Sequence, residues 1–254
     1  MDTPVIQFKN VSKAFGTKII LDQVSFQVNK GETLAVIGPS GTGKSTVLKM
    51  LIGLLAPDSG EIIIKGQNVV DFGEEQWNEL RRHMGMVFQY SALFDFLDVG
   101  ENVAFGLRQH TQSSETKIQQ RVCALLDQVG LPNTEHLYPA ELSGGMKKRV
   151  GLARALALDP DIIFYDEPTA GLDPIMANNI SRLILQTKKL LGVTSLLVTH
   201  DMASAFLAAD KILLLNQGHI AFTGTVEETK TSTNSLVREF IGGEDVLTGA
   251  LRKE

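Results

Sequence analysis

The chain has 254 residues, 43% of them hydrophobic and 21% charged, which is typical of a globular, water-soluble protein with one large or two small domains. Its formal net charge of −5 argues against a general nucleic-acid-binding protein, because such proteins usually carry a basic surplus. The single cysteine, Cys123, excludes an internal disulfide bond, and we expect it to be buried on a helix.

The sequence offers no targeting or membrane-spanning segment. The stretch MDTPVIQFKN lacks a basic region followed by an apolar core, so we expect no secretory signal. No apolar run approaches the ~18 residues that a membrane-spanning helix needs. We therefore expect a cytoplasmic protein, which a partner can still hold on a membrane.

The first part of the chain is rich in strand patterns. The partial alternation of ILDQVSFQV predicts an antiparallel sheet, which the preceding run VIQF can join. The continuous apolar run TLAVIG predicts a buried parallel strand. A helix, TVLKMLIGLL, and two further strands, EIIIKGQNV and MGMVFQ, follow it.

From about residue 90 to 150 the patterns become helical. Asp98 and Glu101 have the spacing of a helix capping box, and a later segment has an apolar stripe of Ile118, Val122, Leu125, Leu126 and Val129. The strand DIIFYDEP, a helix over 174–191, the strand TSLLVTH, the helix ASAFLAAD and a hairpin turning near 216–218 complete the chain. This alternation predicts an α/β fold with a mostly parallel sheet. We expect one domain over 1–241, with a helical subdomain inserted at about 90–150, and a loosely held polar tail over 242–254.

A phosphate-binding loop is the clearest motif. GPSGTGKS matches G-x-x-x-x-G-K-[ST] and lies between an apolar strand and a helix, which is the context that the motif requires. Its glycines let backbone N–H groups surround phosphate oxygens at a helix N-terminus. Lys44 is expected to reach the β- and γ-phosphates, and the Ser45 hydroxyl to ligate Mg²⁺. The expected nucleotide-binding residues here are Gly38, Ser40, Gly41, Gly43, Lys44, Ser45 and Thr46.

An acidic pair ends the later buried strand. Asp166 and Glu167 would lie at the carboxyl edge of the sheet, where α/β proteins bind ligands. We expect Asp166 to hold hydrated Mg²⁺ and Glu167 to polarise the attacking water. Gln89, His200 and Asp173 are three further polar residues near strand ends or turns, although each has an ordinary structural explanation when taken alone.

A second anion-binding pattern is present in ELSGGMKKRVGLAR, where Ser143, Gly144 and Gly145 precede a basic helix. With these residues the chain resembles the ATP-binding cassette (ABC) ATPase family over about 4–241. The resemblance implies a P-loop NTPase core with an N-terminal antiparallel β subdomain and an inserted α-helical subdomain. ATP and Mg²⁺ are the implied cofactors. Phe15 is the implied adenine-stacking residue, although it lacks the hydroxyl of the more usual tyrosine.

The family resemblance also assigns roles to the remaining motifs. Gln89 and His200 join Glu167 as catalytic residues, Gln89 is also a metal ligand beside Ser45 and Asp166, and Asp173 contacts nucleotide. Ser143, Gly144 and Gly145 close over the ATP of a second copy in a head-to-tail dimer.

The segments FQYSALFDFLDVGENVAFGLRQH and LSGGMKKRVGLARALALDP resemble the ATPases of the Mla/Mce phospholipid transport systems. This resemblance implies an MlaE-like integral membrane permease, an MCE-domain lipid-binding subunit, and a location on the inner face of the cytoplasmic membrane. The apolar residues Leu93, Phe94 and Phe96 either fill the helical subdomain or dock the permease. Tyr90 and Gly106 depart from the usual family pattern in this region.

Two other functions stay open from the sequence alone. One is the ATPase of an importer for an amino acid or another small solute. The other is an ABC protein without a permease, acting in DNA repair, translation or iron–sulfur assembly.

Overall fold

The structure, a computed structural model, describes residues 4–242 and separates into two compact units. The first unit combines Met1–Phe72 with Thr194–Glu254, and the second is Gly73–Val193. The polar tail expected over 242–254 lies, beyond Gly242, outside the described residues. The expected single domain over 1–241 stays a prediction.

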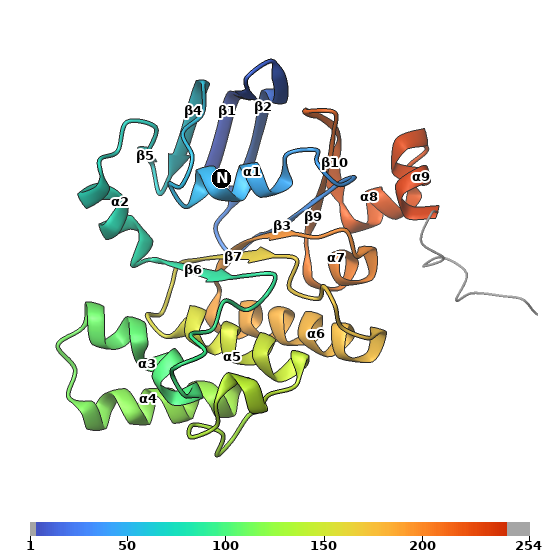
Figure 1. Cartoon of the computed structure of the whole chain (residues 1–254). Helices are drawn as coiled ribbons and strands as arrows, with labels where there is room; N and C mark the ends of the chain where they lie inside the picture. The colour runs from blue at the N-terminus through green and yellow to red at the C-terminus, as the bar shows by residue number, and fades with distance from the viewer. Residues whose placement is uncertain (1–3, 243–254) are drawn as a thin grey trace, which may run out of the picture. The chain divides into compact units, whose positions relative to one another are not determined.

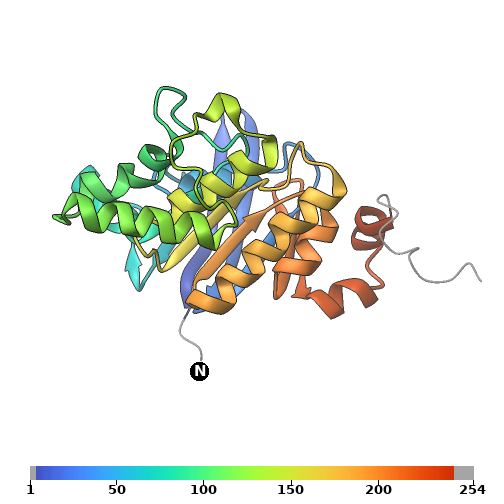
Figure 2. The same ribbon diagram turned by 90° about the horizontal axis from the view of Figure 1, so that it is seen from below.

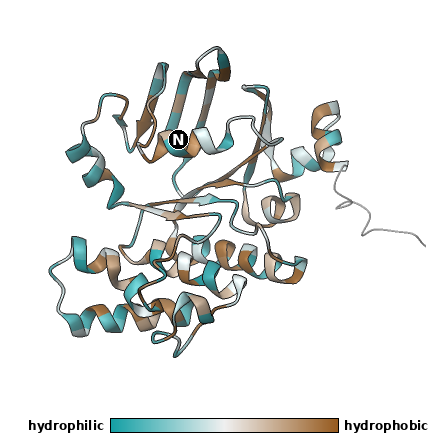
Figure 3. Cartoon of the chain, viewed as in Figure 1, coloured by the Kyte–Doolittle hydropathy of each residue, from teal (hydrophilic) through white to brown (hydrophobic). Residues whose placement is uncertain are grey.

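An antiparallel sheet forms the N-terminal part of the first unit, as predicted. Its order is β2-β1-β4-β5, and its strands lie side by side in Figure 1. Figure 3 shows the alternation of the sequence as brown and teal bands along β1 and β2. The rings of Phe8 and Phe26 stack at 4.6 Å across these two strands. The bounds are β1 Pro4–Phe15, β2 Lys18–Asn29, β4 Ser59–Ile64 and β5 Gln67–Asn68.

A second group of strands in the same unit carries the nucleotide-loop segment. β3 is parallel to both β8 and β9, and β9 forms the predicted hairpin with β10. Every residue of β3 and β8 is buried, which explains their continuous apolar sequences. The strands are β3 Thr33–Ile37, β8 Thr194–Val198, β9 Lys211–Asn216 and β10 His219–Thr225, and the helices are α1 Lys44–Leu51, α7 Met202–Ala208, α8 Val226–Thr231 and α9 Ser235–Gly242.

The second unit is mainly helical. Its two strands pair in parallel, and between them the chain forms only helices and loops, as the pattern over 90–150 predicted. Figure 2 shows α3 and α4 in green beside each other. The elements are α2 Glu74–Arg81, β6 Met84–Val87, α3 Val99–His110, α4 Glu115–Gln128, the short 3-10 helix η1 Pro139–Glu141, α5 Gly144–Leu156, β7 Ile162–Asp166 and α6 Pro174–Leu191.

The predicted apolar stripe of α4 is buried, but the expectation for Cys123 is wrong. Cys123 is exposed on α4, because it follows the buried Val122 by one residue and is rotated away from the stripe. A side-chain hydrogen bond to Glu135 raises the pKa of its thiol. Among residues 4–242, no helix is both long and apolar enough to cross a membrane.

Candidate functional site

The phosphate loop of the first unit ends in a helix without a side-chain cap. α1 begins at Lys44, and its N-cap Gly43 has a φ of 105° and supplies no side-chain hydrogen bond. Only glycine adopts this backbone easily, and a Cβ here would come within 2.8 Å of the Leu21 side chain. The start of α1 is therefore open to an acceptor such as a phosphate oxygen.

Two further features shape this loop for a polyphosphate. Lys44 is buried, and its Nζ donates to the carbonyls of Gly38 at 2.7 Å and Pro39 at 2.9 Å. A Cβ on Gly38 would lie 2.1 Å from the carbonyl oxygen of Leu215, so the loop can follow β9 this closely only with glycine. Gly41 has a φ of 80° and would carry its Cβ into open space. The residues present therefore fit a bound triphosphate.

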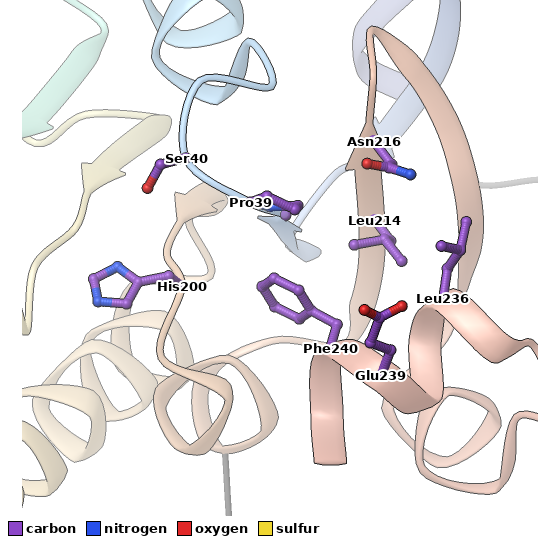
Figure 4. A pocket seen from close by; sticks show the side chains of 9 residues that line it. Pro39, Ser40, His200, Leu214, Asn216, Leu236, Glu239 and Phe240 are labelled. Carbon is purple, nitrogen blue, oxygen red and sulfur yellow. The ribbon is translucent and has the colours of Figure 1, made fainter. Parts of the chain in front are cut away.

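A hollow of about 560 Å³ adjoins the first half of the loop within the same unit. Gly38, Pro39 and Ser40 line it together with His200, which follows β8. Figure 4 shows Pro39, Ser40 and His200 with side chains that α9 contributes, among them Glu239 and Phe240. The structure thus brings His200 and the phosphate loop to one hollow, and the catalytic role of His200 stays a prediction.

Phe15 lies at the end of the β1–β2 hairpin of the first unit. It pairs with Lys18, and its ring is half exposed, with Lys13 Nζ 5.7 Å from the ring centroid. Further along β2, Ile20 and Leu21 lie against the Gly43 end of the phosphate loop. An exposed aromatic ring can stack on a base, and the stacking of Phe15 on adenine stays a prediction.

The acidic pair belongs to the second unit. Asp166 is the last residue of β7, and Glu167 follows with a φ of 46°. This left-handed backbone is strained for a glutamate and aims its side chain differently from that of a strand residue. The Glu167 carbonyl accepts a hydrogen bond from Ala170 N at 3.1 Å, which closes the turn.

Asp173, for which the family resemblance implies a nucleotide contact, also has a structural role. It is the N-cap of α6, and its Oδ1 accepts from the backbone amides of Ile175 and Met176, each at 3.0 Å. Its side chain thus fixes the start of α6 within the second unit. The proposed contact of Asp173 with nucleotide stays a prediction.

The LSGG segment of the same unit starts α5. Ser143 is the N-cap, and its Oγ accepts from Met146 N at 3.3 Å. The first turn of α5 contains no acidic residue, so its N-terminus can attract an anion. A Cβ on Gly144 would meet only the Leu172 side chain, at 3.5 Å, so the fold of one chain leaves room at this position.

Three residues that no sequence motif singles out hold the segment after Gln89. The first, Lys148, is buried, and its Nζ donates to the carbonyls of Gln89 and, at 3.4 Å, Glu167. Burial lowers the pKa of Lys148, and the carboxylates of Asp166 and Glu167 oppose that shift. The only sequence signal was the basic character of the helix after LSGG.

The other two missed residues are Arg154 and Asn102. Arg154 donates to the carbonyls of Ser91 at 2.7 Å and Ala92 at 2.6 Å, which have positive φ values of 62° and 45°. Fully buried Asn102 accepts from Phe94 N at 2.8 Å and donates to the carbonyl of Phe94 at 3.1 Å. The segment after Gln89 is therefore tied to both α5 and α3.

This segment presents aromatic rings to solvent. Tyr90 is 86% exposed and Phe96 78% exposed, and Phe105 of α3 is also exposed. Phe94 is partly buried, with its ring 5.8 Å from Phe96 and 4.8 Å from Phe105. The apolar residues of this segment could fill the helical subdomain or dock a permease. Phe96 does not fill the core of the subdomain, because its side chain is exposed.

A family profile described as ABC transporter matches residues 21–170, and the chain belongs to this family. It is an ATP-binding and ATP-hydrolysing subunit, with the P-loop ABC ATPase fold that the motifs predicted. A solved ATP-binding cassette, described as dimeric in a post-hydrolysis state bound to ADP and Pi, is 32% identical. That match covers 87% of this chain and 98% of the other, with a TM-score of 0.79.

Three relatives cover most of this chain. "Protein TRIGALACTOSYLDIACYLGLYCEROL 3, chloroplastic" of Arabidopsis thaliana is 44% identical over 98% of this chain and 76% of its own length. The "Intermembrane phospholipid transport system ATP-binding protein MlaF" of Haemophilus influenzae is 41% identical over 96% of this chain and 92% of its own. The "Probable ribonucleotide transport ATP-binding protein mkl" of Mycobacterium leprae is 41% identical over 95% of this chain and 70% of its own.

Proposed function

We propose that the chain powers a transporter that moves phospholipids between inner and outer membranes. The observation that carries this proposal is the 41% identity to a phospholipid-transport ATP-binding protein across 96% of this chain and 92% of that relative. The proposed partners are an MlaE-like permease and an MCE-domain lipid-binding subunit. The chain would then lie peripherally on the cytoplasmic face of the inner membrane.

A second cargo class is a small solute, because one relative is named for ribonucleotide transport. Affinity purification of the tagged chain from gently solubilised native membranes separates the two. A permease that co-purifies with an MCE-domain protein supports lipid transport, and phospholipid transfer in reconstituted vesicles is the next assay. A permease with a solute-binding protein contradicts the lipid proposal, and recovery of no membrane protein contradicts both cargo classes.

The proposed catalytic roles follow the motifs. Lys44 and the loop amides bind the ATP phosphates, Phe15 stacks on adenine, and Ser45, Gln89 and Asp166 would hold Mg²⁺. The metal ion neutralises charge on the transferred phosphoryl group when it is bound. Glu167 accepts a proton from the attacking water, and His200 contacts the transferred phosphate.

Glu167→Gln tests this assignment. It should leave ATP binding unchanged and lower turnover by roughly 10²–10⁴-fold, the usual effect of losing a positioned proton acceptor. Phosphate release and binding of a fluorescent ATP analogue are measured on the same preparation. Turnover within a few-fold of the unchanged chain would exclude the role of Glu167.

We further propose that Ser143, Gly144 and Gly145 act on the ATP held by a second copy. In support, α5 has an accessible anion-attracting start, and the solved cassette with 32% identity is described as dimeric. Ser143→Arg should abolish hydrolysis and ATP-dependent dimerisation but preserve ATP binding by the monomer. Loss of monomer binding would indicate instead that Ser143 serves its own chain's nucleotide.

The permease is proposed to dock on the exposed rings of Tyr90, Phe96 and Phe105 and the partly buried ring of Phe94, called here the aromatic surface. Exposed rings that gather on one segment are typical of a protein contact. Phe96→Ser should reduce the amount of permease that co-purifies, whereas Leu190→Ser, on the exposed face of α6, makes a similar change elsewhere. Equal recovery of permease with both variants would contradict docking at Phe96.

A further inference from the structure

One side chain of α5 connects two of the sequence motifs. The buried ammonium group of Lys148 contacts the carbonyl of Gln89, which begins the segment leading to the aromatic surface. It also contacts the carbonyl of Glu167, immediately after β7. Lys148 lies in the second turn of α5, so the helix that starts with LSGG carries this connection.

The burial of this lysine requires an explanation. A buried ammonium group is unfavourable unless hydrogen bonds and opposite charges compensate it. Two carbonyls and the nearby carboxylates of Asp166 and Glu167 provide that compensation. The ammonium group of Lys148 therefore lies close to two carboxylates, those of Asp166 and Glu167.

The contact with Glu167 acts on a strained residue. A φ of 46° is unfavourable for glutamate, and Ala170 N already donates to the Glu167 carbonyl in the turn. Lys148 adds a second donor to the same carbonyl, which restricts rotation of the peptide group. The direction of the Glu167 side chain depends on that peptide orientation, because the two share one Cα.

We propose that Lys148, on the LSGG helix, is a positioning residue for ATP hydrolysis. Its side chain fixes the backbone of Glu167 and links it to the backbone of Gln89. This inference rests on the proposed role of Glu167 as proton acceptor. Lys148 does not touch the reacting atoms, and its effect passes through Glu167. A displacement of about 1 Å in a catalytic group can lower a rate about 100-fold.

The test compares Lys148→Met, which keeps an unbranched side chain and removes the donors, with Lys148→Arg, which keeps the charge and the donors. Lys117→Met makes the same chemical change on the exposed face of α4. For each full-length variant, kcat, KM for ATP, the affinity for a fluorescent ATP analogue and the thermal midpoint are measured. If Lys148→Met does not fold, Lys148→Gln, which keeps a neutral donor, takes its place.

Lys148→Met should lower kcat by about 10- to 100-fold with KM and affinity changed by less than about threefold. Lys148→Arg should recover most of the rate, and Lys117→Met should match the unchanged chain. An unchanged kcat in Lys148→Met would overturn the inference. The inference would also be overturned if Lys148→Met lowered the rate and the ATP affinity equally and Lys148→Arg did not restore the rate.

Combining the changes separates this inference from the proposed role of Glu167. In single-turnover measurements, adding Lys148→Met to Glu167→Gln should slow hydrolysis little further, because both act through the same carboxylate. Full additivity would overturn the role of Lys148 while leaving that of Glu167 intact. Rapid turnover in Glu167→Gln alone would instead exclude the proton acceptor itself.

Discussion

Replacing Asn102 by leucine should destabilise the protein measurably. The side chain is fully buried, accepts one hydrogen bond from Phe94 N, and shares its two amide hydrogens among the carbonyls of Phe94, Leu97 and Asp98. Leucine has a similar volume but makes none of these bonds. We count one bond for the side-chain oxygen and one for each of the two amide hydrogens. Three lost hydrogen bonds at about 1 kcal/mol each give a loss near 3 kcal/mol. For a chain of this size that corresponds to roughly 6–12 °C in thermal midpoint.

Differential scanning fluorimetry and urea denaturation of the purified chain measure this loss. Asn179→Leu, on the exposed face of α6, is the matched control and should change the free energy of unfolding by less than about 0.5 kcal/mol. Asn102→Asp should be worse than Asn102→Leu at neutral pH, because it places an anion beside three carbonyl oxygens. A shift below about 2 °C for Asn102→Leu would refute the reasoning, since the bonds would then contribute almost no net stability.

Three further outcomes follow from local geometry. Gly38→Ala should weaken ATP binding by more than about tenfold, because its Cβ would lie 2.1 Å from a backbone carbonyl oxygen. Gly73→Ala, where a Cβ has room, should bind ATP normally; titration with a fluorescent ATP analogue measures both variants. Asp173→Ala should lower the free energy of unfolding by about 1 kcal/mol in urea, and Asp173→Asn, which keeps an N-cap oxygen, by less. Hydrogen bonds from Lys13 and from the backbone amide of Ala14 lower the pKa of Asp58, so its carboxylate stabilises the fold above the usual carboxyl pKa and loses that contribution as pH falls. Asp58→Asn should therefore reduce the thermal midpoint at neutral pH, and the reduction should shrink as pH is lowered.

Much of the fold could be predicted because local patterns agree with the packing. The strand TLAVIG, the helix over 174–191 and the hairpin near 216–218 all appear where the sequence places them. The error at Cys123 has a simple cause: apolar character alone does not place a residue on the buried side of a helix, whereas its angular position relative to Val122 does.

The nucleotide motifs were recognisable, but the contacts that hold them were not. Lys148 and Gln89 are far apart in sequence, so no local pattern pairs them. The positive φ of Glu167 is equally hidden, because a glutamate gives no sign of a left-handed backbone in the way that glycine does. The exposure of Phe96 also depends on how Asn102 and Arg154 fold the segment, which apolar content alone does not reveal.

The open start of α1 has a consequence for the lifetime of the protein in a cell. Because no side chain caps this helix, a phosphate group bound there would supply the missing acceptor. A ligand that binds only the folded state stabilises it by about 2.7 kcal/mol at a concentration 100 times its Kd. A bound nucleotide would thus protect the chain from proteolysis. The amount of the protein in a cell would then depend on the fraction of it that holds nucleotide.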